Sequence, residues 1–289
     1  MKKKFNSFIC IGGILAVLLP LLFLVGLFWT PFPPDEMHAM AKFQAPSAQH
    51  LLGTDNLGRD VLSRIMDGMG TSFFIAICVV LIGCFFGIVI GSLCGYYGGI
   101  ADAILTRLCD TITAFPAMLL ALIVISITGG GQYNIILVLG ILFIPSFARI
   151  VRTEYARVRD LNYIQSARLM GVSTFRIMYV HILPNTVPVL LPAVTIGFNN
   201  AILSEASMSF LGIGVLPPQI SLGEASMSFL GIGITPPQAS LGTMLKDSQS
   251  YLRNAPWFAL CTGCAIVLII LSFSLLSEGI QQRNRSKKI

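Results

Sequence analysis

The feature that most constrains this fold is a series of long apolar runs, each close to the length of a membrane-spanning helix. A helix crosses the hydrocarbon core of a bilayer with about 20 apolar residues. The chain is 55% hydrophobic and 11% charged, whereas soluble domains carry about 25% charged residues. We therefore predict an all-α membrane protein with six transmembrane helices: Phe8–Trp29, Thr71–Tyr96, Thr111–Thr128, Tyr133–Ala148, Thr186–Ser204 and Pro256–Ser277.

The first apolar run follows three lysines and so has the layout of a signal peptide. Its apolar part, about 22 residues, is longer than the hydrophobic region of a typical signal peptide. The nearest cleavage-like sequence, Ala39-Met40-Ala41, lies well past Trp29. We interpret Phe8–Trp29 as a retained transmembrane helix.

The distribution of lysine and arginine predicts the orientation, because cytoplasmic loops are enriched in these residues. With the N-terminus inside, 14 of the 19 lysines and arginines fall on inside segments. The other five lie outside: Lys42, Arg59, Arg64, Lys246 and Arg253. Both termini are thus predicted to be cytoplasmic, and the net charge of +6 reflects topology. It requires no nucleic-acid partner.

These predictions divide the chain into three regions. Residues 1–69 hold the first helix and a long extracytoplasmic loop, in which glycines and aspartates indicate turns and caps. Residues 70–280 hold the other helices, and residues 281–289 form a basic cytoplasmic tail. We expect the long loop to be an ordered cap on the outer face rather than a solvated loop. Helical spacing is predicted to begin after Asp60.

The largest cytoplasmic segment is the loop 149–185. A helix is predicted over Arg152–Met170, and Gly171 suits the position just past its C-terminus, where a positive φ is needed. Ser173 or Thr174 can cap a second helix, which Pro184 is expected to stop. A DNA-binding helix-turn-helix has a similar layout, but this unit is tethered to the membrane at both ends.

Two tandem copies of a 19-residue sequence follow the fifth run, in what we predict to be an outer loop at 205–242. Glu205–Gly223 and Glu224–Gly242 are identical at 16 of 19 positions. Two copies are too few for a solenoid. We expect one copy to pack and the other to be displaced, because exposing both apolar copies to water is unfavourable.

Several kinds of active site are missing from the sequence. The dipeptide Gly-Lys does not occur, so the chain has no P-loop, and neither HExxH nor GxSxG is present. The three histidines are scattered, and the pair Cys261 and Cys264 lies within a predicted span, where we interpret both as packing residues. We expect no catalytic residue, no metal site and no cofactor in this chain.

The interiors of the six predicted spans contain no Asp, Glu, Lys, Arg or His. Ion-coupled carriers place such residues in the membrane, so a secondary carrier is disfavoured. The most polar buried pair is Asn199 and Asn200, which are candidate pore-lining residues. The alternative for both is hydrogen bonding between helices. A membrane scaffold without a transport role remains a third class.

The cytoplasmic loop resembles the "EAA" loop found in permease subunits of bacterial ABC importers. That pattern is Glu-Ala-Ala, three residues, Gly, nine residues, then Ile-x-Leu-Pro. The spacing matches at every step, although Gln165, Ser166 and His181 differ in residue type. The matching positions are Gln165, Ser166, Ala167, Gly171, His181, Leu183 and Pro184.

Other segments resemble the C-type permeases of dipeptide, oligopeptide and nickel importers, and together the resemblance covers roughly Phe8 to Gln281. They are Leu51–Gly68, the GYYGG at Gly95–Gly99 and the repeated EASMSFLGIG. The family normally carries that last segment once. In the outer loop the signature residues are Gly53, Thr54, Asp55, Gly58, Arg59 and Asp60.

The resemblance implies a type I ABC importer permease fold in the bacterial cytoplasmic membrane, and a subunit that is not itself an enzyme. Its implied partners are a second homologous permease, two ABC ATPases and an extracytoplasmic substrate-binding protein. Residues 149–185 would then be the coupling loop that docks on an ATPase, and the chain would form half of the pore. The implied cargo is di- or oligopeptide, with nickel or a metal chelate as the alternative.

Overall fold

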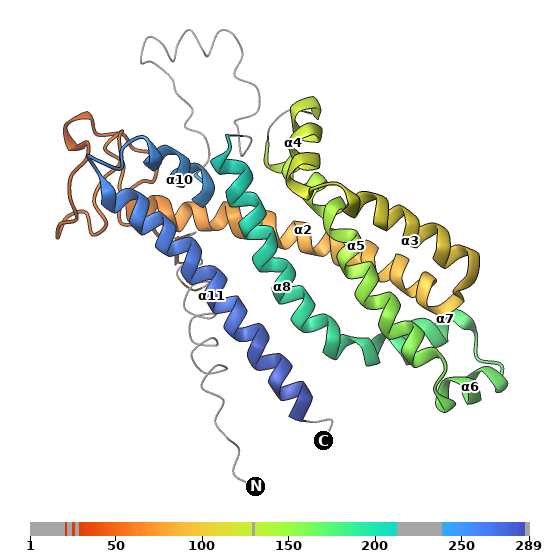
Figure 1. The fold of residues 1–289 in the computed structure, drawn as a ribbon. Coiled ribbons are helices and arrows are strands. Elements are labelled where there is room, and N and C mark those ends of the chain that lie inside the picture. The colour runs from red at the N-terminus through yellow and green to blue at the C-terminus, as the bar shows by residue number, and fades with distance from the viewer. Residues whose placement is uncertain (1–20, 22–24, 27–28, 129–130, 213–238, 287–289) are drawn as a thin grey trace.

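The computed structural model describes residues 21, 25–26, 29–128, 131–212 and 239–286. Its described part is helical (Figure 1) and contains no strand, only an isolated bridge between Thr54 and Asp60. The elements are η1 (Ala39–Ala41), α2 (Val61–Tyr97), α3 (Gly99–Ala114), α4 (Ala117–Thr128), α5 (Gln132–Arg159), α6 (Asn162–Leu169), α7 (Thr174–Arg176), the π-helical η2 (Ile177–Ile182), α8 (Leu183–Phe210), α10 (Leu241–Gln249) and α11 (Pro256–Ser286).

Four described segments are long and apolar enough to cross a membrane: Val61–Tyr97, Gln132–Arg159, Thr174–Phe210 and Pro256–Gln282. A fifth span results if α3 and α4 are counted together, although they are bent by 84°. The predicted first span, Phe8–Trp29, lies largely outside the described residues. The structure therefore supports four or five of the six predicted spans, and the total of six and the orientation remain predictions.

The third predicted span, Thr111–Thr128, is not one straight helix. α3 ends at Ala114, and Phe115 is extended, with φ −87° and ψ 141°. A residue that precedes a proline disfavours the helical region, because the proline ring clashes with its backbone. Pro116 therefore accounts for the break between α3 and α4.

The second and fifth helices extend beyond their predicted ends. α2 begins at Val61 rather than at Thr71, since the Asp60 side chain accepts a hydrogen bond from the Ser63 backbone N–H at 2.8 Å and caps the helix. α8 runs to Phe210 rather than to Ser204. Both helices carry charged residues outside the predicted spans: α2 carries Arg64, and α8 carries the fully buried Glu205.

α2 and α5 pack closely through a row of glycines four residues apart: Gly83, Gly87, Gly91 and Gly95. A Cβ atom on Gly91 would lie 2.5 Å from the carbonyl oxygen of Ala148, and one on Gly95 would lie 2.6 Å from that of Arg152. Small residues at this spacing let two helix backbones approach each other. The two helices thus form one tightly packed pair.

The rest of the core joins α2 to α8 and α11. The Phe198 ring lies 5.6 Å from the Phe73 ring and 4.5 Å from the Phe273 ring, between ring centroids. In Figure 1 the loop before α2 and the short helix α10 gather at one end of the molecule, and α6 and α7 lie at the other. The two motif-bearing regions are thus at opposite ends of the helices.

The tandem repeat contributes buried residues from both of its ends, and the expectation that one copy packs and the other is displaced falls mostly on residues outside the described part. Residues 205–210 of the first copy form the last turns of α8. Ala239, Ser240, Leu241 and Gly242 of the second copy are all buried at the start of α10. Residues 213–238, between these parts, lie outside the described residues.

Candidate functional site

The cytoplasmic loop forms two helical pieces where one helix, Arg152–Met170, was predicted. α5 ends at Arg159, Asp160 has φ −94° and ψ 2°, and Leu161 is extended with ψ 145°. α6 then begins at Asn162. Gln165, Ser166 and Ala167, predicted to belong to a coupling loop, therefore lie on a short helix that is separate from α5.

Gly171 takes the conformation predicted for it. Its φ is +77°, and its backbone N–H donates to the Arg168 carbonyl at 3.1 Å. The Val172 N–H donates to the Ala167 carbonyl at 3.1 Å. These two hydrogen bonds form a Schellman motif, which ends α6 and turns the chain.

Beyond Gly171 the chain rejoins the membrane helix without a stop. Ser173 occupies the N-cap position of α7, but its side chain makes no capping hydrogen bond. The prediction that Pro184 stops the helix is wrong, because Pro184 lies in the first turn of α8. Just before it the Leu183 N–H donates to the Met178 carbonyl, five residues back. A proline lacks an N–H and is tolerated in a first helical turn, and here that turn follows a π-helical segment.

We call residues 162–182, which the sequence predicts to be cytoplasmic, the cytoplasmic unit. Its inner side is packed, since Ile164, Ala167 and Ile182 are buried. Gln165 and Ser166 are exposed, and His181 and Leu183 are half-buried. The exposed side also carries large apolar side chains: Leu169 is 89% exposed, Met170 76% and Phe175 74%.

Three polar contacts hold the cytoplasmic unit against its neighbours. The Tyr155 hydroxyl on α5 donates to the Met178 carbonyl at 2.9 Å. Arg168 on α6 donates to the Tyr96 hydroxyl, near the end of α2, at 3.2 Å. The Asn185 amide donates to the Tyr163 hydroxyl at 3.0 Å. These contacts fix the unit relative to α2, α5 and α8, so its exposed apolar face has a defined orientation.

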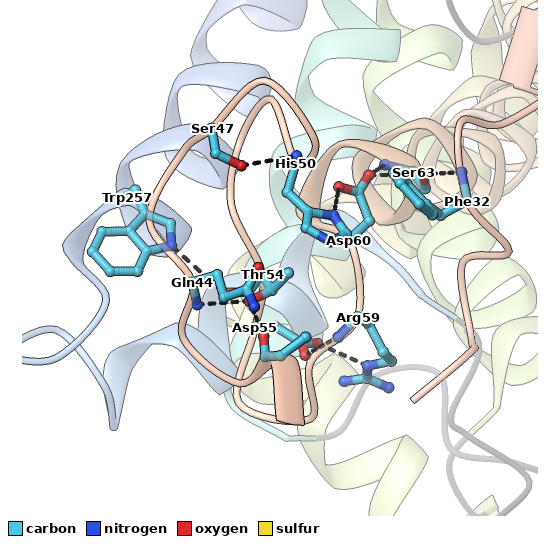
Figure 2. Close-up of polar contacts among 11 residues, drawn as sticks. Phe32, Gln44, Ser47, His50, Thr54, Asp55, Arg59, Asp60, Ser63 and Trp257 are labelled. Carbon is cyan, nitrogen blue, oxygen red and sulfur yellow. Dashed lines mark hydrogen bonds and ion pairs between the residues drawn. The ribbon is translucent and has the colours of Figure 1, made fainter. Parts of the chain in front are cut away.

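At the opposite end, the outer-loop signature folds around the carboxylate of Asp55 (Figure 2). Arg59 Nε donates to it at 2.7 Å and Arg64 donates at 3.2 Å, and all three side chains are buried. The same carboxylate accepts from the backbone N–H groups of Leu57 and Arg59. A buried charge is tolerated only when it is paired and hydrogen-bonded, and Asp55 meets both conditions.

Asp60 is a second organising residue of this loop. Besides capping α2 it lies 3.0 Å from Nδ1 of His50, and both side chains are buried. Thr54 accepts from the Gln44 N–H at 2.8 Å. Gly58 has φ +79°, and a Cβ there would lie 1.9 Å from the His38 carbonyl oxygen. The prediction of an ordered cap is therefore confirmed, and the solvated-loop alternative is not.

Two further acids lie around this cap. Burial raises the pKa of Asp247, on α10, although Arg59 and Lys246 oppose the shift. Burial likewise raises the pKa of Asp35, and Arg59 again opposes it. Both carboxyl groups therefore lie close enough to Arg59 for its charge to lower their pKa.

A cavity of about 980 Å³ lies between the bent α3–α4 pair, α5 and α8. Its wall is mainly apolar and includes Asn200 and Ser204. The neighbouring Asn199 faces α11 instead, where its amide donates to the Ile270 carbonyl at 3.2 Å and to the Ser274 hydroxyl at 2.8 Å. Of the two candidate pore-lining residues, Asn200 lies at a cavity, and Asn199 makes the interhelical hydrogen bonds of the alternative interpretation.

The sequence pattern of the family "Binding-protein-dependent transport system inner membrane component" matches residues 87–286. That range covers more than half of the chain and includes the whole cytoplasmic unit. The chain belongs to this family.

Similar members of the family support the match along nearly the whole chain. It is 34% identical over 284 residues to the dipeptide transport system permease protein DppC of Haemophilus influenzae, covering 96% of this chain and 90% of the relative. It is 38% identical over 238 residues to the glutathione transport system permease protein GsiD of Pectobacterium atrosepticum, covering 82% of this chain and 73% of the relative.

The fold of this inner membrane component also matches solved importers. An inward-facing structure of the MetNI methionine ABC transporter aligns with a TM-score of 0.51 at 16% identity, covering 76% of this chain and 96% of the other. A chain of an amino acid ABC transporter crystallised with histidines aligns with a TM-score of 0.52 at 17% identity, covering 76% and 94%. The chain is thus a multi-pass membrane protein with the helical fold of ABC importer permeases.

Sequence reasoning missed two residues of this transport component. Glu205 was placed in an outer loop, yet it is fully buried in α8, where it accepts from the hydroxyls of Ser72 and Ser209, each at 2.8 Å. Tyr96 was noted only as the end of a predicted span and within the GYYGG segment, yet its hydroxyl accepts a hydrogen bond from Arg168 on α6. Within the described residues, no group of three His, Cys, Asp or Glu side chains could hold a metal ion.

Proposed function

We propose that this chain is the transmembrane permease subunit of an ATP-driven ABC importer and forms half of the pore for di- or oligopeptide uptake across the bacterial cytoplasmic membrane. The family match and the peptide-transport names of its relatives support this function. ATP is hydrolysed by separate ATPase subunits, which accords with the lack of a P-loop in the sequence.

The observation that carries the proposal is the exposed apolar face of the cytoplasmic unit. Leu169, Met170 and Phe175 are at least 74% exposed, in a region that the sequence places in the cytoplasm rather than in lipid. Exposed apolar groups beside a rigid turn are typical of a protein interaction site. We assign this face, together with Gln165 and Ser166, as the docking site for an ATPase subunit.

The remaining partners follow from the same assignment. A second homologous permease would close the cavity beside α3, α4, α5 and α8 and complete the pore, with Asn200 on its wall. A binding protein would deliver substrate to the outer cap built on Gly53, Thr54, Asp55, Gly58, Arg59 and Asp60. We further assign residues 1–69, 70–280 and 281–289 as the three regions of the chain, with both termini cytoplasmic.

Peptide is favoured over nickel as the cargo. The relatives named above transport dipeptides and glutathione by name, and the described residues hold no cluster of metal ligands. A pore that handles peptides can be lined largely by apolar side chains, as this cavity is.

Purification in a mild detergent from the native host tests the docking assignment. The tagged chain should retain two P-loop ATPases and a second permease. In Leu169→Asp and in Gly171→Pro the ATPases should be lost while the second permease is kept. Gly171→Pro acts on the turn, since it removes the N–H bonded to Arg168 and excludes the positive φ.

Leu252→Asp is the matched control, because Leu252 is 52% exposed and lies between α10 and α11, away from the cytoplasmic unit. It should retain the ATPases. A wild-type chain that purifies alone would contradict the proposed function, and ATPases retained by Leu169→Asp would contradict the docking face.

A further inference from the structure

α6 is joined to α5 by a short stretch that is not helical. Asp160 and Leu161 leave the helical conformation, and the Leu161 N–H donates to the Val158 carbonyl in a local turn. Few-residue junctions of this kind act as hinges, because they absorb changes in φ and ψ. A force applied to α6 would therefore bend this junction before it displaced α5.

A second connection ties α6 directly to α2. The Arg168 guanidinium donates to the Tyr96 hydroxyl at 3.2 Å and lies 5.5 Å from the centre of the Tyr96 ring. The two interactions use different parts of one side chain, a hydrogen bond at the hydroxyl and a cation–π contact at the ring face. Tyr96 is buried, so its ring is held in place.

The α5 side of the hinge is tied to the same turn of α2. Arg159, the last residue of α5, donates to the Gly95 carbonyl at 3.1 Å and to the Tyr96 carbonyl at 3.4 Å. These carbonyls lie at the C-terminal end of α2, where a cation is favoured by the helix dipole. Arg159 and Arg168 thus lie on opposite sides of the hinge, and both are attached to Tyr96.

The α2–α5 pair, to which Tyr96 belongs, is rigid. The glycine row packs α2 against α5, and a Cβ on Gly95 would meet Tyr155 and Arg152 of α5 at less than 3 Å. Two elements joined at one hinge rotate freely, whereas elements joined at the hinge and at a second point move together. With Tyr96 in place, α6 is connected to the α2–α5 pair at two points: the junction with α5, and the contact between Arg168 and Tyr96 on α2.

We propose that Tyr96 is a positioning residue of the transport cycle, which makes the α2–α5 pair follow a displacement of α6. The inference rests on the proposed docking of an ATPase on α6. Without the Tyr96 contact, ATP hydrolysis would continue and α6 would stay bonded to α8 through Tyr163 and Asn185, but the α2–α5 pair would follow α6 less closely.

The test uses the complete complex, with its ATPases, second permease and binding protein, in proteoliposomes. The readout is peptide imported per ATP hydrolysed, with ATPase retention measured on the same samples. Tyr96→Phe keeps the ring and loses the hydroxyl, and Tyr96→Leu loses both. We expect the ratio in Tyr96→Leu to fall about tenfold, because a charged hydrogen bond and a cation–π contact are lost together. Tyr96→Phe should lie between Tyr96→Leu and the wild type.

Tyr133→Leu is the matched control, since Tyr133 is 69% exposed at the far end of α5, and its ratio should be unchanged. Arg168→Ala combined with Tyr96→Leu should be no worse than either single variant. An unchanged ratio in Tyr96→Leu would overturn the inference, as would loss of the ATPases from that variant, which would indicate a docking or folding role. Absence of ATP-dependent uptake in the wild type would instead count against the proposed function.

Discussion

At the scale of single residues, the outer cap depends on one buried carboxylate. Asp55 is 0% exposed and is the hydrogen-bonded partner of two buried arginines, Arg59 and Arg64. Removal of one partner from a buried ion pair costs more than the pair contributes, because the other charge stays buried and unpaired. Loss of the Asp55 carboxylate would therefore leave Arg59 and Arg64 buried without their negative partner.

We predict that Asp55→Asn destabilises the protein by about 3 kcal/mol, since Arg64 and Arg59 lose their negative partner. The measurement is the thermal unfolding midpoint of the purified chain in detergent. Asp110→Asn is the control, because the ion pair of Asp110 with Arg149 is more than half exposed, and such pairs contribute about 0–1 kcal/mol. Equal midpoints for the two variants would refute the role of Asp55.

A second prediction about stability concerns Glu205, which is buried inside the helix bundle. Glu205→Ala removes the acceptor of the Ser72 and Ser209 hydroxyls and leaves a void, at a cost of about 2–4 kcal/mol. Glu205→Gln keeps the shape and an acceptor, so its unfolding midpoint should lie closer to that of the wild type. Ser207→Ala, on the same helix, should have little effect, because the Ser207 hydroxyl bonds only its own helix at the Leu203 carbonyl. Equal midpoints for Glu205→Ala and the wild type would contradict this account.

The residues that could be predicted from the sequence are those whose partners lie nearby in the chain. Asp60 caps α2 through Ser63, and Gly171 ends α6 through Arg168, so both followed from local spacing. Glu205 bonds Ser72, 133 residues away, and local patterns carry no information about such a contact. The same reason hid the Arg168–Tyr96 contact, which joins residues 72 apart.

At the scale of the elements, apolar runs identified the helices but not their ends. The run at Thr71–Tyr96 predicted the middle and end of α2, whereas its first turns, from Val61 to Gly70, include the buried polar residues Ser63 and Arg64. Pro184 was expected to stop a helix, but the π-helical η2 brings it into a first turn, where a proline is accepted. Helix ends that depend on distant partners, such as the last turns of α8 with Glu205 bonded to Ser72, could not be predicted from local spacing.

The glycine row leads to an element-scale prediction. Gly91→Ala should lower the unfolding midpoint, because the added Cβ would lie 2.5 Å from the Ala148 carbonyl oxygen and would force α2 and α5 apart, at about 1–3 kcal/mol. Gly263→Ala in α11 is the matched control, since a Cβ there meets no atom within 4 Å. It should be neutral or slightly stabilising, because alanine favours a helix over glycine. A Gly91→Ala variant as stable as Gly263→Ala would show that the close packing is not required.

At the scale of the whole molecule, the tandem repeat is anchored at both ends. α8 is continuous into the first copy, and α10 starts within the second. The 19 additional residues must therefore be accommodated between Gly212 and Ala239. Long insertions between fixed ends cost little, provided that the end residues are kept.

Two deletions of equal length test whether the end residues of the repeat matter, rather than the length of the loop. Removal of 213–231 keeps the described residues of both ends and should retain assembly and uptake. Removal of 224–242 restores a single copy too, but it puts Ile220 at the position of Ala239, which is 1% exposed. Overpacking there should cost about 1–3 kcal/mol, seen as a lower unfolding midpoint of the assembled complex. A higher unfolding midpoint for the variant that lacks 224–242 than for the variant that lacks 213–231 would contradict the importance of the end residues.

The central claim is that the chain is a permease driven by ATP, and uptake into proteoliposomes tests it most directly. The complete complex is reconstituted with its binding protein and supplied with a labelled dipeptide. We predict accumulation that requires both ATP and the binding protein and that persists when an ionophore removes all ion gradients. Accumulation without ATP that collapses with the ionophore would identify a secondary carrier and would contradict the account.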